Sequence, residues 1–298
     1  MSLFVQLLLN GLVAGSVYAL VAVGFALIFG ATRHFHIAHA GIFASGGYLT
    51  YLFSSSIGLP APIAAVLGIA LAVLLGVLMV RVLYVPLNRR GGQGFILFLV
   101  SLGLLTMLDN IFTIGLGAQP AKPDLGPWFT TVQPLGAWSL TVGQIVIIVL
   151  ALTMFAGLVL CLDRTRAGKL VKAYSGNPEF FEIFGLRPSV VLTLVYAVGS
   201  LFAAVAGTYM ASDIGMQPGL GEQYFIVGIM AVFIGGIGSI RGAFTAAMLL
   251  GVLQNLLLLY MGAGWTLAAV FAAFLIFITI SPEGLQTLSL PSKKRRLS

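Results

Sequence analysis

The chain has 298 residues, of which 59% are hydrophobic and only 8% are charged. A soluble domain carries about 25% charged residues, so this composition excludes a soluble globular protein and indicates an integral membrane protein. The formal net charge of +7 is therefore interpreted as a signal of membrane orientation and not of binding to nucleic acid. The single cysteine, Cys161, excludes an internal disulfide, and we expect neither a metal site nor a cofactor.

Nine apolar stretches follow one another along the chain, separated by short breaks rich in glycine, proline or charge. They fall at 4–30, 36–56, 61–84, 95–116, 140–162, 190–211, 223–240, 243–261 and 265–281. Long unbroken apolar runs are typical of membrane-spanning helices, whereas the strands of a membrane barrel alternate. We predict an all-α, polytopic transmembrane helical bundle of about eight to nine spans, forming a single domain over residues 1–298.

The first stretch lacks the basic start of a signal peptide, so we expect it to be retained. It leads into a polar cluster that contains His36 and His39, which share a helical face. An ionisable group in or near a span is a functional candidate, and we place His36, His39, Asp109 and Asn110 nearest a translocation path. Edge anchoring by the histidines and helix contacts by Asp109 and Asn110 are the alternatives. A membrane-embedded enzyme is disfavoured, because the histidines and Asp109 lie in opposite halves of the membrane.

Basic residues gather in alternate breaks, with Lys122 as the exception. These basic breaks contain Arg33; Arg81, Arg89 and Arg90; Arg164, Arg166, Lys169, Lys172 and Arg187; Arg241; and the basic tail 291–298. Cytoplasmic loops carry an excess of lysine and arginine. This rule predicts an outside N-terminus and a cytoplasmic C-terminus.

Two glycine-rich segments leave the span count open. Stretch 36–56 and the break at Gly235, Gly236 and Gly238 permit a segment that re-enters the membrane without crossing it. The break lacks the strand and helix context of a phosphate-binding loop, so we interpret its glycines as a helix break or a tight helix contact. Residues 15–22 resemble residues 199–206, which suggests a two-fold internal repeat of the kind found in transporters.

The longest basic loop, 163–188, contains a predicted short helix. Asn177 is a suitable N-cap, Pro178 suits the first helical position, Glu179 lies in the first turn and Gly185 ends the helix. Phe180, Phe181 and Phe184 are expected to form its apolar face. Such a helix either lies on lipid or inserts into a groove of a cytoplasmic partner. The chain has no P-loop motif, so any ATP hydrolysis belongs to another subunit.

A series of matching motifs then extends over nearly the whole chain. It consists of Asn10-Gly, Gly15-Ser-x-Tyr-Ala-Leu20, Ala38-His39, Ser101-Leu-Gly103, Asn110, Asn177-Pro, Gly185, Gln217-Pro218, Gly235-Gly-Ile-Gly-Ser-Ile-x-Gly-Ala243 and Pro282-x-Gly284. In this order and spacing, the chain resembles the integral membrane permease subunit of ABC importers for branched-chain amino acids. Two departures are Gly41 and Val227, where many relatives carry a carboxylate and a lysine. The joint loss of both members of an ion pair would explain both departures. This explanation predicts that positions 41 and 227 are close in space.

The resemblance implies a non-catalytic subunit of the bacterial cytoplasmic membrane that moves branched-chain or other hydrophobic amino acids by ATP-driven alternating access. It implies that Asn177, Pro178, Glu179, Phe181, Phe184 and Gly185 belong to a coupling helix that docks on a cytoplasmic ATP-binding subunit. A second homologous permease subunit, a periplasmic or extracellular solute-binding protein and the membrane lipid are the other implied partners. Transport of urea or short amides, and a stand-alone secondary carrier, are the alternatives.

Overall fold

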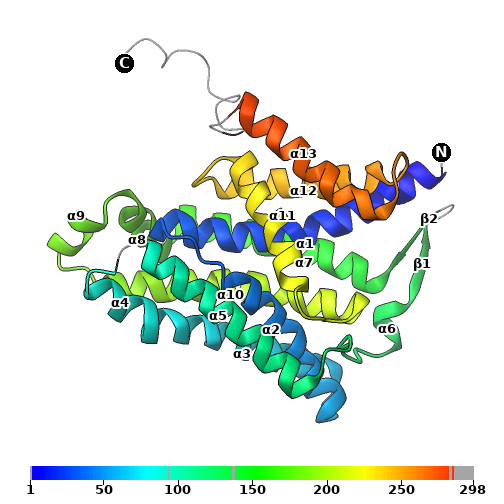
Figure 1. The fold of residues 1–298 in the computed structure, drawn as a ribbon, viewed down its shortest axis with the longest axis horizontal. Coiled ribbons are helices and arrows are strands. Elements are labelled where there is room, and N and C mark those ends of the chain that lie inside the picture. Colours follow the sequence, from blue (N-terminus) through cyan, green and yellow to red (C-terminus); the bar gives the residue numbers. More distant parts are fainter. Residues whose placement is uncertain (1, 93, 136–137, 282–283, 285–298) are drawn as a thin grey trace.

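The computed structural model describes residues 2–92, 94–135, 138–281 and 284. The basic tail 291–298 lies outside the described residues. The helices are α1 (Ser2–Thr32), α2 (His39–Tyr51), α3 (Ala61–Leu78), α4 (Val85–Arg89), α5 (Gly94–Leu116), α6 (Pro127–Thr130), α7 (Val142–Arg164), α8 (Arg166–Gly176), α9 (Pro178–Ile183), α10 (Pro188–Ile214), α11 (Leu220–Gly235), α12 (Ile240–Leu257) and α13 (Ala263–Ile280). Two π-helical segments, Leu52–Ser56 and Met79–Tyr84, follow α2 and α3, and the antiparallel strands β1 (Val132–Leu135) and β2 (Trp138–Thr141) form a hairpin. The all-α bundle is confirmed (Figure 1).

Seven helices in the described part of the chain are long and apolar enough to cross a membrane: Leu3–Thr32, Ala61–Arg89, Gly94–Leu116, Val142–Arg164, Pro188–Ile214, Ile240–Leu257 and Ala263–Ile280. The predicted stretches 36–56 and 223–240 instead contain the shorter helices α2 and α11. At 1.5 Å per residue, α11 with its 16 residues is about 24 Å long, which is less than the roughly 30 Å hydrocarbon core, whereas α2 continues without a break into the π-helical segment Leu52–Ser56. Both short helices are largely buried, where protein shields their ends.

Helix α1 lies at the centre of the bundle and is packed by small residues. A Cβ atom added at Gly24 would lie 2.7 Å from the Gly199 carbonyl oxygen of α10, and one added at Gly15 would lie 3.0 Å from Met248 Cα of α12. In α2, a Cβ added at Gly47 would lie 2.8 Å from Ala211 Cβ of α10. Helices in lipid associate through such close packing contacts, because the hydrophobic effect does not drive apolar side chains out of a hydrocarbon solvent.

Helices α1 and α10, which carry the two similar segments, pack side by side and antiparallel. Gly199 contacts both Gly24 and Ile28 of α1, whereas Tyr196, earlier in α10, contacts His34, later in the chain than α1. Residue numbers therefore increase along α1 in the direction in which they decrease along α10, so the two helices are antiparallel. The internal repeat itself stays a prediction.

The two ends of the bundle differ in charge. At one end, here called the basic end, α4, α8 and α9 lie together (Figure 1), and Arg241 at the start of α12 pairs with Asp163 near the end of α7 at 2.9 Å. At the other end, here called the hairpin end, Gln6 of α1 hydrogen-bonds Ser139 of β2, and Lys122 Nζ donates to the Asp213 carbonyl at 2.7 Å. The breaks that are basic in the sequence therefore lie mainly at one end of the bundle, and Lys122 lies at the other.

Candidate functional site

Helix α9 projects at the basic end of the bundle (Figure 1). The Phe180 N–H donates to Asn177 Oδ1 at 3.0 Å, so Asn177 caps the helix. Pro178 occupies the first helical position and Glu179 the first turn. Gly185 has φ of +73°, the left-handed conformation that commonly ends a helix. The predicted short helix and its two ends are confirmed.

The three phenylalanines of α9 do not share one face, which corrects the predicted arrangement. Phe181 is 4% exposed and packs edge to face on Tyr174 of α8, whereas Phe184 is 77% exposed. Phe180 and Ile183 are exposed beside it. The reason is a tertiary contact, because Tyr174 of α8 covers the Phe181 ring and leaves the Phe184 ring in the open. The exposed apolar face is therefore Phe180, Ile183 and Phe184; the spacing of Ile183 from Phe180 was the signal for the residue that the sequence analysis omitted.

A polar cleft of about 520 Å³ lies beside α9, between α4 and the start of α10. It is lined by charged and polar side chains that include Arg89, Glu182 and Arg187. A smaller cavity of about 60 Å³ is lined by Thr32, His34, Val80, Tyr84, Asn88, Leu97, Tyr174, Leu192 and Tyr196. Tyr174 and Asn88 line both spaces. Tyr174, on which Phe181 of α9 packs, therefore also borders the interior of the bundle.

Behind the small cavity lies a buried cluster of histidine and tyrosine side chains. His34 Nε2 lies 2.6 Å from the Tyr196 hydroxyl, and His36 Nδ1 lies 3.0 Å from the Tyr84 hydroxyl. Burial lowers the pKa of His34 to about 4 and lowers the pKa of His36 well below its usual value, so both rings are neutral at neutral pH. The cluster holds the α1–α2 connection against α10 and the π-helical segment Met79–Tyr84.

The four predicted path residues form two separate groups. His36 and His39 are fully buried inside this chain, where Ser101 of α5 lies 3.4 Å from His36 Nδ1. Asp109 is half-buried and Asn110 is exposed, eight residues and about 12 Å further along α5. The histidines thus border packed protein, and their position relative to the membrane edge stays a prediction. Sequence reasoning missed Tyr84 and Tyr196, whose partnership with the histidines joins segments distant in the chain.

The exposed face of α5 carries polar and small groups within an apolar helix. Asn110 Nδ2 donates to the Thr106 carbonyl at 2.7 Å, and Thr106 is exposed as well. Gly103 is also exposed and has open space where a Cβ would be. Polar groups in a span are costly when they face lipid. This face is therefore suited to another protein surface or to water.

Comparison with known proteins decides the family. The family described as "Branched-chain amino acid transport system / permease component" matches residues 7–280. The chain belongs to this family. This permease is 26% identical over 294 residues to the high-affinity branched-chain amino acid transport system permease protein BraD of Pseudomonas aeruginosa, covering 95% of both chains. It is also 26% identical over 294 residues to LivH of Escherichia coli, again with 95% of each chain covered.

Two further likenesses are more distant. The ribose import permease protein RbsC of Escherichia coli is 28% identical over 266 residues, covering 83% of this permease and 76% of RbsC. A solved structure titled "PsaBC from Streptococcus pneumoniae in complex with Fab" matches with a TM-score of 0.53 at 14% identity, covering 94% of this permease and 93% of that chain. The second likeness concerns the fold alone. With the apolar helices, the family match and the likeness to BraD indicate a multi-pass protein of the inner membrane.

In this permease the glycine-rich break separates α11 from α12. Helix α11 ends at Gly235, and Gly236 and Gly238 have φ of +95° and +90°. Ser239 Oγ then accepts the Gly242 N–H at 2.9 Å and caps α12. A Cβ added at Gly235 would clash with the backbone of Gly242 and Ala243. The glycines therefore combine a chain reversal with direct backbone packing between two helices.

Two remaining sequence hypotheses concern charges and metals. A Cβ at position 41 would lie 2.8 Å from Leu108 and 3.5 Å from Leu105, both in α5. Position 41 thus faces α5, while Val227 is buried in α11, and the suggested proximity of the two positions stays a prediction. Among the residues that the structure describes, no three histidine, cysteine, aspartate or glutamate side chains are placed to hold a metal ion.

Proposed function

We propose that this permease is the membrane subunit of an ABC importer that moves branched-chain or other hydrophobic amino acids by ATP-driven alternating access. The observation that carries the proposal is the exposed apolar face of α9, formed by Phe180, Ile183 and Phe184 at the basic end. Large apolar side chains on a short capped helix suit insertion into a groove. We propose that the partner providing this groove is a cytoplasmic ATP-binding subunit.

The basic end is proposed to face the cytoplasm of the bacterial cell. Arg89 and Arg187 line one cleft there, and Arg33 lies beside Lys172, which shares Asp163 with Arg241. This is in accord with the excess of basic residues in cytoplasmic loops. In this orientation the N-terminus is outside and the C-terminus is cytoplasmic. The hairpin end then receives substrate from an extracytoplasmic solute-binding protein.

The translocation path is proposed to follow the exposed face of α5, against a second homologous permease subunit. Asp109 and Asn110 are the path residues on this face, and Thr106 lies one turn away. A partner surface would remove these groups from lipid, and water between the two surfaces would hydrate them. The buried His36 is proposed to act on the path through α5, to which Ser101 connects it, and His39 is buried beside it.

A test of coupling compares two double variants in the purified transporter. Ile183→Asp with Phe184→Asp places charges on the exposed face of α9, and Thr130→Asp with Gln133→Asp is a control at exposed positions of the hairpin end, outside the membrane-crossing helices. We expect the first pair, and not the second, to lose the co-purifying ATPase and ATP-driven uptake in proteoliposomes. A chain that purifies without an ATPase and transports on a solute gradient alone would instead be a secondary carrier.

The substrate class rests on the relatives that this permease matches over 95% of its length, BraD and LivH. RbsC, whose name assigns it to ribose import, makes a polar substrate the second candidate. ATP-driven uptake of labelled leucine, ribose and a short amide, each measured separately in the complete transporter, separates these classes. Uptake of ribose and not of leucine would transfer the assignment to a sugar.

A further inference from the structure

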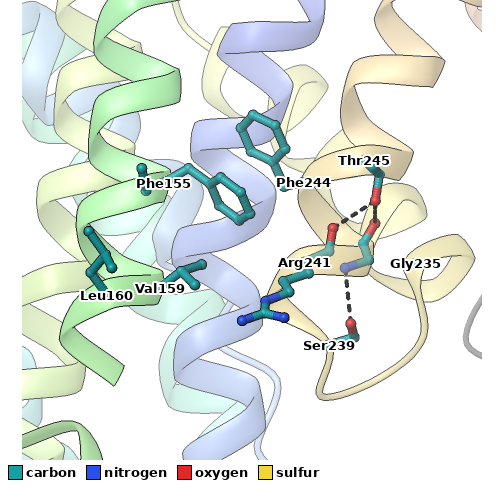
Figure 2. A pocket seen from close by; sticks show the side chains of 10 residues that line it. Phe155, Val159, Leu160, Gly235, Ser239, Arg241, Phe244 and Thr245 are labelled. Atoms are coloured by element: carbon teal, nitrogen blue, oxygen red, sulfur yellow. Dashed lines mark hydrogen bonds between the residues drawn. The ribbon is translucent and has the colours of Figure 1, made fainter. Parts of the chain in front are cut away.

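An apolar groove of about 830 Å³ lies between α7 and α12 at the basic end (Figure 2). Phe155 of α7 and Phe244 of α12 stack with ring centroids 4.0 Å apart, and Val159 and Leu160 continue the wall along α7. Leu160 and the neighbouring Leu152 are exposed on the outer face of α7. The groove therefore opens onto a surface whose composition suits hydrocarbon.

The end of the groove is positively charged. Figure 2 shows the Arg241 side chain extending from α12 into the space beside Val159 and Leu160. Its guanidinium pairs with Asp163 at 2.9 Å, but Lys172 pairs with the same carboxylate at 2.7 Å. Two cations thus share one anion, and the Arg241 side chain is 72% exposed. The N-terminus of α12, which begins at Ile240, adds its positive dipole at the same place.

We propose that this groove binds an anionic phospholipid, with the phosphate on Arg241 and one acyl chain along Phe155, Phe244 and Val159. The apolar walls favour a lipid over free phosphate, and the unshared positive charge favours an anionic over a zwitterionic headgroup. Basic pockets between membrane helices bind acidic headgroups in this way. The proposal needs only the membrane placement of α7 and α12 and is independent of the transported substrate.

The test measures lipid retained by the purified transporter complex after exchange from nanodiscs of equal phosphatidylglycerol and phosphatidylcholine, using native mass spectrometry. Arg241→Gln removes the charge and leaves Lys172 on Asp163. Arg90→Gln is the control, because Arg90 is an exposed cation at the end of α4 and does not line this groove. Ala156→Trp fills the groove from an exposed position of α7.

We expect the unmodified complex and Arg90→Gln to retain phosphatidylglycerol preferentially. Arg241→Gln should reduce that preference severalfold while phosphatidylcholine still binds, and Ala156→Trp should reduce both lipids. Equal phosphatidylglycerol retention by Arg241→Gln and Arg90→Gln would overturn the proposal. So would efficient cross-linking of Ala156→Cys, in a Cys161→Ser background, to a second permease subunit, because protein would then occupy the groove.

Discussion

Phe181 packs edge to face on Tyr174, with ring centroids 5.5 Å apart. Tyr174 in turn borders the small cavity that His34, Tyr84 and Tyr196 also line. Helix α9 is therefore joined by one aromatic contact to the residues that hold the α1–α2 connection.

Phe181 and Phe184 should give opposite results when changed to alanine. Phe181→Ala removes a buried ring at a cost of about 3 kcal/mol, which should loosen α9 on α8. Phe184→Ala removes an exposed ring and should leave α9 in place while weakening ATP-driven uptake. Amide hydrogen exchange over residues 178–185, measured beside uptake, separates the two effects. Faster exchange in Phe184→Ala than in Phe181→Ala would refute this division.

Gly185 should be intolerant of a side chain for conformational reasons alone. Nothing lies within 4 Å of an added Cβ at either Gly185 or Gly176, but only Gly185 has a positive φ. Gly185→Ala should therefore destabilise the end of α9 by about 1–2 kcal/mol. We expect this variant to lose coupled uptake while its insertion into the membrane stays normal. Gly176→Ala is the matched control and should retain uptake. Gly185→Asn should recover part of the loss, since asparagine tolerates this conformation.

Gly235 tests the contact between α11 and α12. An added Cβ would meet the Gly242 backbone, so Gly235→Ala should cost about 1–3 kcal/mol as an overpacked helix contact. Gly157→Ala is the control, because an added Cβ there has open space in α7. Thermal unfolding in detergent should show a lower midpoint for Gly235→Ala only. Equal midpoints would mean that the two helices separate without penalty.

Asn110 and Ser101 test the path face of α5. Cys161 is the only cysteine in the sequence, so Cys161→Ser provides a background without thiols. Asn110→Cys should react with a water-soluble, membrane-impermeant maleimide, and Ser101→Cys, at a fully buried position, should react far more slowly. If Asn110→Cys reacts only with membrane-permeant reagents, this face meets lipid and the proposed path is wrong.

His34 predicts a dependence of stability on pH. Burial lowers its folded pKa to about 4, whereas an unfolded histidine titrates near 6.5. The unfolded chain therefore binds the proton first, so stability is complete above pH 6.5 and falls as the pH decreases from 6.5 to 4. This difference in pKa corresponds to a change in the free energy of unfolding of about 3 kcal/mol.

His34→Gln retains an acceptor for Tyr196 and removes the titration. Its unfolding midpoint in detergent should therefore fall less steeply than that of the unmodified chain between pH 6.5 and 4. The comparison isolates His34 from the neighbouring His36, which titrates in both proteins. Parallel pH profiles would show that His34 is not shielded from water in the folded state.

The sequence alone was sufficient for the fold class, the long spans and the short helix α9. Hydropathy reports directly on membrane helices, because the bilayer requires about 20 apolar residues for a span. The caps of α9 were also predictable, since Asn177 and Gly185 act on their immediate neighbours. The separation of charge between the two ends followed from the order of the basic breaks.

Only the tertiary structure decided which side chains are available. Nothing local distinguishes Phe181 from Phe184 until Tyr174 covers one ring, and nothing local buries His36 until Tyr84 and Ser101 pack on it. The same holds for α2 and α11, whose short, buried helices depend on the helices around them. Propensity and hydropathy are properties of neighbouring residues, whereas burial and polar partnership arise from contacts between segments that are distant in the chain.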